Sequence, residues 1–130
     1  MKKNYLYALL LALLLCGCQE SLEKKCQREC ELYTKKNCPG NLGDNTIIDS
    51  MVFEATSHTI HYYYTLTGSA DSVGILSNSD ARRALLDDLR NSTITRQYKE
   101  ADYNFSYTYH SQSRPELVLY EVTLTAKDYK

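Results

Sequence analysis

The stretch Thr59-Ile60-His61-Tyr62-Tyr63-Tyr64-Thr65-Leu66-Thr67 decides the fold, because its side chains alternate with a period of two. Its apolar and aromatic face carries Ile60, Tyr62, Tyr64 and Leu66. Its polar face carries Thr59, His61, Tyr63, Thr65 and Thr67. Side chains of a β-strand point alternately to the two sides of the sheet, so this pattern predicts a strand with one buried face.

Three other segments are predicted to be strands. Residues 46–56 are rich in Ile, Val, Met and Phe and are joined to the first stretch by a turn at Ser57-His58. Residues 103–110 and 118–125 both alternate apolar with polar side chains, and a turn at 111–115 separates them. The short links predict two hairpins.

Two segments have helical spacing. Residues 20–36 are polar, with Leu22, Cys26, Cys30 and Tyr33 on one face, and the Pro and Gly that follow end the helix. A turn-rich connector is expected at 41–45 and a loop at 68–77. A second helix, capped by Ser79 or Asp80, is predicted to end near Asn91.

These elements predict an α+β domain with the order N-terminal helix, then β-β-α-β-β. Because each strand has one apolar face, the expected sheet is curved, antiparallel and four-stranded, with helix on one side. As an analogy of layout, this order resembles the cystatin fold.

The N-terminus has the parts of a secretory signal: Lys2 and Lys3, an apolar run from Leu6 to Leu15, and small residues at its end. Leu15-Cys16-Gly17-Cys18 resembles the lipobox of bacterial lipoproteins. We therefore expect a signal peptide at 1–17, lipid attachment at Cys18 with a polar helical spacer over 18–37, and the domain at 38–130. An ordinary secreted protein cut near Gly17 is the alternative.

The lipoprotein resemblance implies a diacylglyceryl thioether on Cys18 and acylation of its new amine, with fatty chains such as palmitate as the membrane anchor. Gln19, rather than Asp, follows the lipid site, which by this resemblance indicates the outer membrane. The acidic run after it partly resembles a surface-export signal, so both the periplasmic and the surface side stay open.

Three cysteines remain in the mature chain, namely Cys26, Cys30 and Cys38. A bond between Cys26 and Cys30 would be strained on a helix, so a disulfide is expected between Cys30 and Cys38 or between Cys26 and Cys38. No fourth ligand with zinc spacing lies nearby, so no metal is expected.

Charge and composition exclude some functions. Removal of residues 1–17 takes away Lys2 and Lys3 and leaves 13 basic against 16 acidic side chains, a balance of −3. This balance disfavours a nucleic-acid partner. No phosphate loop, dinucleotide fingerprint or nucleophile elbow occurs in the sequence, so neither a cofactor nor an enzymatic activity is expected.

The polar faces of the strands supply the candidate binding face, formed by His61, Tyr63, Thr65 and His110. Two histidines on one face can bind a metal or act as acid and base. An exposed tyrosine can stack on a sugar or join a protein interface. Solvated strand residues are the plainer interpretation of all four.

The body also resembles small uncharacterised bacterial envelope lipoproteins. The resemblance lies in Cys38-Pro39, Thr46 to Ser50, Tyr62 to Leu66 and Tyr107 to Tyr109. It implies no known activity. We therefore predict a non-catalytic, lipid-anchored envelope protein that binds or scaffolds an envelope partner. An inhibitor or immunity-type lipoprotein, and a metal-binding or enzymatic domain that uses the histidines, are the alternatives.

Overall fold

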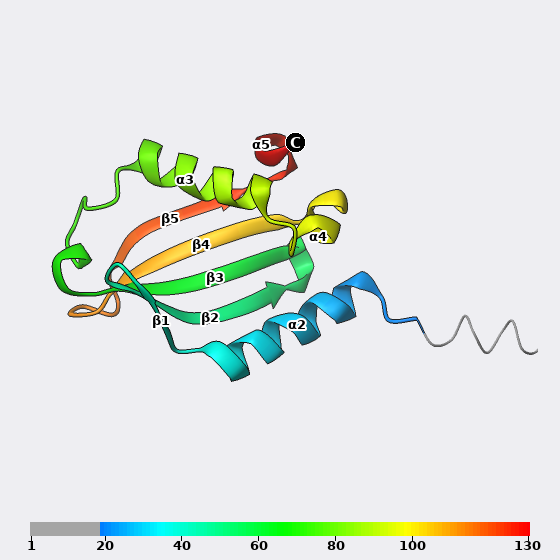
Figure 1. Cartoon of the computed structure of the whole chain (residues 1–130), viewed down its shortest axis with the longest axis horizontal. Coiled ribbons are helices and arrows are strands. Elements are labelled where there is room, and N and C mark those ends of the chain that lie inside the picture. Colours follow the sequence, from blue (N-terminus) through cyan, green and yellow to red (C-terminus); the bar gives the residue numbers. More distant parts are fainter. Residues whose placement is uncertain (1–18) are drawn as a thin grey trace, which may run out of the picture.

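The computed structural model describes residues 19–130 as a sheet with helices on one side (Figure 1). The strands are β1 (Gly40–Gly43), β2 (Thr46–Glu54), β3 (Thr59–Leu66), β4 (Asn104–Ser111) and β5 (Val118–Leu124). The α-helices are α2 (Leu22–Asn37), α3 (Asn78–Asn91), α4 (Arg96–Glu100) and α5 (Ala126–Tyr129). Two short 3-10 turns, η1 (Ala55–Ser57) and η2 (Gly68–Ala70), complete the elements.

The sheet has five strands in the order β1-β2-β3-β4-β5 and is not wholly antiparallel. β3 and β4 run parallel, with Thr59 opposite Asn104 and Leu66 opposite Ser111, whereas the other three pairs are antiparallel. Parallel neighbours need a crossover of a dozen or more residues, and the segment that contains α3 and α4 provides it. The expected α+β class is confirmed, but the expected sheet of four antiparallel strands is wrong in its strand number and in the direction of one pair, and the cystatin-like layout is not exact.

The fifth strand is β1, which falls in the expected connector at 41–45. It is short and glycine-rich, and only one of its residues, Gly40, is not exposed, so it lacks the alternation that marks a strand in the sequence. It pairs only with β2 and forms an edge of the sheet. Both predicted hairpins are present, because β2 pairs with β3 and β4 pairs with β5.

The helix α2 begins at Leu22 because Ser21 caps it, with the Ser21 hydroxyl accepting from the Lys24 amide at 3.2 Å. This helix packs along β2, and Cys26 and Cys30 enter the main core. Residues 22–37 are thus part of the folded domain, unlike the separate spacer expected from their polar composition. Only a narrow stripe of α2 is buried, which explains why the remaining positions of this helix are polar.

The helix α3 starts two or three residues before the expected position. Ser77, rather than Ser79 or Asp80, is the N-cap, and its hydroxyl accepts from the Asp80 amide at 3.4 Å. Only Leu89 of this helix is fully buried, while Leu85 and Leu86 pack against the core in part. The helix therefore covers the sheet incompletely.

The core lies between the sheet and the helices, and it is built around Phe105 and Leu124, which are both 0% exposed. Stacked tyrosine rings pack against this core in two layers across β3 and β4. Tyr62 stacks on Tyr107 at 5.1 Å, and Tyr64 stacks on Tyr109 at 4.6 Å. Aromatic stacking of this kind adds about 0.5–1.5 kcal/mol per pair to the burial of the rings.

Candidate functional site

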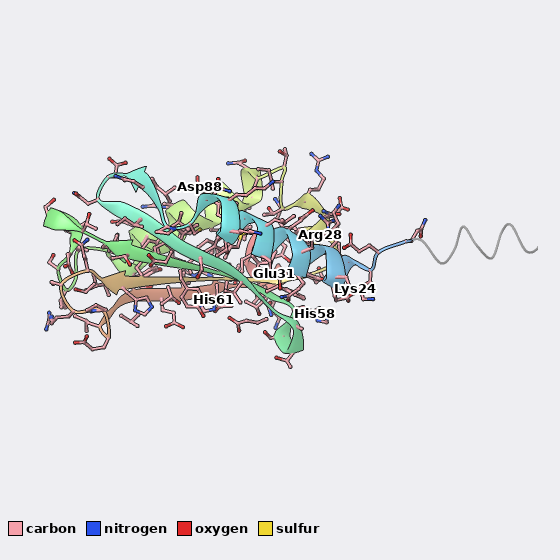
Figure 2. All side chains as sticks on the ribbon, turned by 90° about the horizontal axis from the view of Figure 1, so that it is seen from below. Lys24, Arg28, Glu31, His58, His61 and Asp88 are labelled. Atoms are coloured by element: carbon pink, nitrogen blue, oxygen red, sulfur yellow. The ribbon has the colours of Figure 1, made fainter. Side chains whose placement is uncertain are left out.

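The structure brings the predicted residues His61, Tyr63, Thr65 and His110 together on the open face of the sheet, which we define as the side away from the helices. Figure 2 shows His61 below the sheet, on the side opposite Asp88 of α3 and Arg28 of α2. The Tyr63 ring stacks between the two histidines, 4.1 Å from His61 and 6.4 Å from His110.

A hydrogen-bond network surrounds His61. Its Nδ1 contacts a carboxylate oxygen of Glu54 and lies 3.1 Å from the Tyr63 hydroxyl. Its Nε2 lies 2.7 Å from the Thr108 hydroxyl. A carboxylate, an imidazole and a hydroxyl in series resemble the parts of a nucleophilic triad in their order.

The geometry of this network favours a structural role. Thr108 is only 4% exposed in the middle of β4, so no acyl group can approach its hydroxyl. Within residues 19–130, no three His, Cys, Asp or Glu side chains converge in the way that a metal ion needs. The network therefore holds the side chains of the open face in fixed positions.

A shallow hollow of about 390 Å³ lies at one end of the open face, lined in part by Asp49, Thr65 and His110. The Thr65 hydroxyl donates to Asp49 at 2.7 Å. The Nδ1 atom of His110 is buried and has no partner in the described part of the chain. Of the four predicted residues, Thr65 and His110 line this hollow, while His61 and Tyr63 lie beside it.

The predicted lipid site, Cys18, lies outside the described residues. The three cysteines after it are free thiols, so neither expected disulfide is present. Cys30 lies in the middle of α2 and Cys38 is its C-cap, eight residues further along, which corresponds to a helical rise of ~12 Å. A disulfide needs its Cα atoms within roughly 7 Å, so the pairing would require α2 to unwind.

The sequence did not reveal a second surface, the helix-side groove, which we define as the surface between α2 and α3 floored by Tyr62, Tyr64 and Tyr109. It contains two hollows. One, of about 400 Å³, lies among Leu42, Tyr64, Leu85 and Asp88. The other, of about 270 Å³, lies among Cys30, Tyr62, Ile94 and Tyr98. The ring centroids of Tyr62 and Tyr64, which line one hollow each, are 6.4 Å apart, so the two hollows share a continuous floor.

The groove exists because the helices are far apart. α2 packs on β2 and α3 lies over β5, three strand positions away, or roughly 14 Å. Helices that pack directly are 8–10 Å apart. The alternation of a strand shows which face is buried, but it does not show how much of that face the helices cover. The groove could therefore not be predicted from the sequence.

Burial and charge define the chemistry of the groove. Desolvation by burial raises the pKa of Tyr62 and Tyr64, and it raises that of Tyr109 to about 12, so all three hydroxyls stay protonated at neutral pH. The ionisable side chains that line the two hollows include Glu29, Asp44 and Asp88, and among the described residues no Lys, Arg or His lines them. The apolar side chains Leu42, 55% exposed, and Ile94, 86% exposed, mark its two ends.

The fold is that of a small domain in which helices cover one side of a five-stranded sheet. The chain belongs to the family described as "Domain of unknown function (DUF8479)", whose model matches residues 21–120. A comparison with curated protein sequences finds no match.

Three solved structures show the same fold. The pilotin of the Vibrio vulnificus type 2 secretion system is 7% identical with a TM-score of 0.65, over 84% of this chain and 92% of its own. The pilotin of the Vibrio cholerae type II system is 9% identical with a TM-score of 0.61, over 82% and 91%. A candidate secreted protein of Pseudomonas aeruginosa is 15% identical with a TM-score of 0.64, over 86% and 100%.

No helix within residues 19–130 combines the length and the apolar character that a bilayer crossing needs.

Proposed function

We propose that this chain is a lipid-anchored envelope protein that binds a partner protein and holds it at the membrane. The helix-side groove carries the proposal, because it is an apolar surface with an exposed aliphatic side chain at each end. Similarity to pilotins, which are components of a secretion system, supports a binding or scaffolding role over a catalytic one. The lipobox at Leu15 to Cys18 supports the anchor.

The occupant of the groove is an amphipathic helix of the partner protein. The floor along β3 spans eight residues, or ~26 Å, which is the length of roughly 17 helical residues. An apolar stripe on such a helix would cover Tyr62 and Tyr64. Lysine or arginine beside the stripe would complement the acidic lining, particularly Asp88 and Asp44.

Site-specific photo-crosslinking tests the partner surface. A photo-reactive residue is placed at Leu42 or at Ile94 in the groove, and at Val52 on the open face as the matched control. Val52 is 41% exposed and is also aliphatic. We expect one protein to crosslink from both groove positions in the native envelope, through a helical segment with basic residues. Crosslinks from Val52 alone would move the interface to the open face.

A synthetic peptide of the crosslinked segment then measures the interaction. We expect Leu42→Asp or Ile94→Asp to weaken its binding at least tenfold, since each charge would enter an apolar contact, and Val52→Asp to leave it unchanged. Binding should also weaken as salt is raised. A crosslinked hydrolase or toxin whose activity the protein blocks would instead support the inhibitor or immunity-type alternative.

The anchor has a separate test. In cells fed an alkyne fatty acid, the wild-type chain is expected to take up the label, Cys18→Ser to lose it and Cys16→Ser to keep it. Label that stays on Cys18→Ser would contradict lipidation at Cys18. The open face stays a predicted second binding surface, formed by His61, Tyr63, Thr65 and His110. A crosslink from Val52 would report a partner bound there.

A further inference from the structure

Two thiols lie side by side on the buried stripe of α2. Cys26 and Cys30 are 1% and 2% exposed and stand four residues apart, which places them one turn apart on the same face. This spacing makes the two thiols neighbours in contact on the helix. This contact lowers the pKa of Cys30 and raises that of Cys26.

A third sulfur-containing residue, Met51 of β2, lines the same hollow from the sheet. The Thr34 hydroxyl, one turn after Cys30, donates to the Met51 carbonyl at 2.9 Å and accepts from the Met51 amide at 3.0 Å. These bonds fix the Met51 backbone against α2. Cys26, Cys30 and Met51 all line the 270 Å³ hollow of the groove.

The one carboxylate among the described residues that line this hollow, that of Glu29, is already engaged, whereas the buried Thr95 hydroxyl has no partner in the described part of the chain. The Tyr98 hydroxyl donates to a Glu29 carboxylate oxygen at 2.5 Å, and Lys25 lies 3.8 Å from the other oxygen of Glu29. Most of the remaining lining is apolar, with Ile60 at the back and Ile94 at the mouth. The hollow therefore offers soft sulfur ligands in largely apolar surroundings, with its carboxylate occupied.

Ligand chemistry selects the ion. Thiolate and thioether sulfur prefer Cu(I), which accepts two or three ligands, whereas structural zinc needs four. Helical geometry holds the two thiols in place and disfavours a disulfide between them. The pair is thus poised for a metal rather than for oxidation.

We propose that Cys26, Cys30 and Met51 bind one Cu(I) ion at the base of the hollow. Both thiols lose their protons to solvent, two sulfur–copper bonds form, and the Met51 thioether adds a third, weaker ligand. Copper stays in the Cu(I) state and no electron is transferred. The proposal is independent of the partner helix, because it concerns side chains beneath the groove.

Competition for Cu(I) in the absence of oxygen tests the site. The full chain is used with Cys16→Ser and Cys18→Ser, so that Cys26, Cys30 and Cys38 are its only thiols, and bicinchoninate is the competing chelator. We expect one equivalent of Cu(I) to be taken from the chelator. Cys26→Ala or Cys30→Ala should lower the affinity at least a hundredfold, Met51→Leu about tenfold, and Cys38→Ala not at all.

A second measurement needs no variant of the site. X-ray absorption at the copper edge of the loaded reference protein should show sulfur as the ligand, with two or three Cu–S bonds. Nitrogen or oxygen ligands would overturn the proposal, as would failure to compete with the chelator. Equal binding by a folded variant that lacks both Cys26 and Cys30, or loss of binding in Cys38→Ala, would also overturn it. Circular dichroism checks the fold of each variant.

Discussion

At the scale of single residues, Lys99 of α4 closes the C-terminal end of α3. Its Nζ donates to the carbonyl oxygens of Leu89, Arg90 and Ser92 at 2.6, 3.1 and 2.9 Å. The last carbonyls of a helix have no partner within the helix, and a lysine there also interacts favourably with the helix dipole. One side chain thereby joins the two helices of the crossover.

Lys99→Met should destabilise the protein, because it keeps the aliphatic stem of the side chain and removes all three hydrogen bonds. We expect a loss of about 1–3 kcal/mol in the free energy of unfolding, measured by urea denaturation. Lys36→Met, at an exposed position of α2, is the matched control and should change stability by less than about 0.5 kcal/mol. Equal effects from the two variants would show that Lys99 does not close the helix.

Asp71 makes stability depend on pH. Its carboxylate accepts from the Ser111 hydroxyl at 2.5 Å and from the Ser113 amide at 2.9 Å, and these bonds lower its pKa in the folded state. The stabilisation is complete above the unfolded pKa of about 3.9 and disappears as the pH falls through the lower folded value. Between about pH 4 and 2, the wild type should therefore lose stability more steeply than Asp71→Asn. Asp44→Asn serves as the exposed control in the same denaturation series, and parallel curves for wild type and Asp71→Asn would contradict the assignment.

At the scale of elements, periodicity predicted six of the structural elements and missed the short ones. The alternation in β3 and β4 correctly placed Tyr62 and Tyr107 in the core and His61 on the open face. It did not reveal that the two strands are parallel, because a half-buried strand alternates in either direction. The helix between them was the usable signal, since a strand–helix–strand order favours a parallel pair.

The short elements are held by contacts that a local pattern does not show. α5 has four residues, and Asp128 holds it by accepting from the Thr125 amide at 2.8 Å and from Arg82 of α3 at 2.6 Å. Tyr129 then closes the core, with its hydroxyl donating to the Tyr103 carbonyl at 2.7 Å. Arg82 and Tyr103 are distant from α5 in sequence, so composition alone could not indicate these contacts.

Asp128→Ala should release α5. It removes the cap of the helix and the ion pair with Arg82, which together are worth about 1–2 kcal/mol. Asp87→Ala, on an exposed face of α3, is the control and should have little effect on the urea midpoint. If α5 is the unit affected, Asp128→Ala will also speed amide exchange at Tyr129. A stability loss without that local change would assign the effect to Arg82 instead.

At the scale of the whole molecule, helix coverage divides the sheet into a stable centre and a weakly held edge. β3 and β4 are paired on both sides and carry the tyrosine layers, while β1 pairs only with β2 and is mostly exposed. Val73 and Ile75, in the loop ahead of α3, are also largely exposed. The sequence could predict the centre, because burial there follows strand alternation, but the edge and the groove depend on how far apart the helices lie.

Hydrogen exchange should reproduce this division. Amides of Phe105 to Tyr109 and of Ile60 to Tyr64 are expected to exchange only through global unfolding, since their hydrogen bonds lie under the core. Amides at 41–42 and 72–77 should exchange at least a hundredfold faster, through local opening that leaves the centre intact. Mass spectrometry of peptic peptides measures both regions in one experiment. If β1 exchanged as slowly as β4, the edge would belong to the same cooperative unit, and the Leu42 end of the groove would be a rigid wall. Fast exchange at β1 instead means that an incoming helix can order this edge as it binds, which would make the affinity at Leu42 depend on the stability of β1.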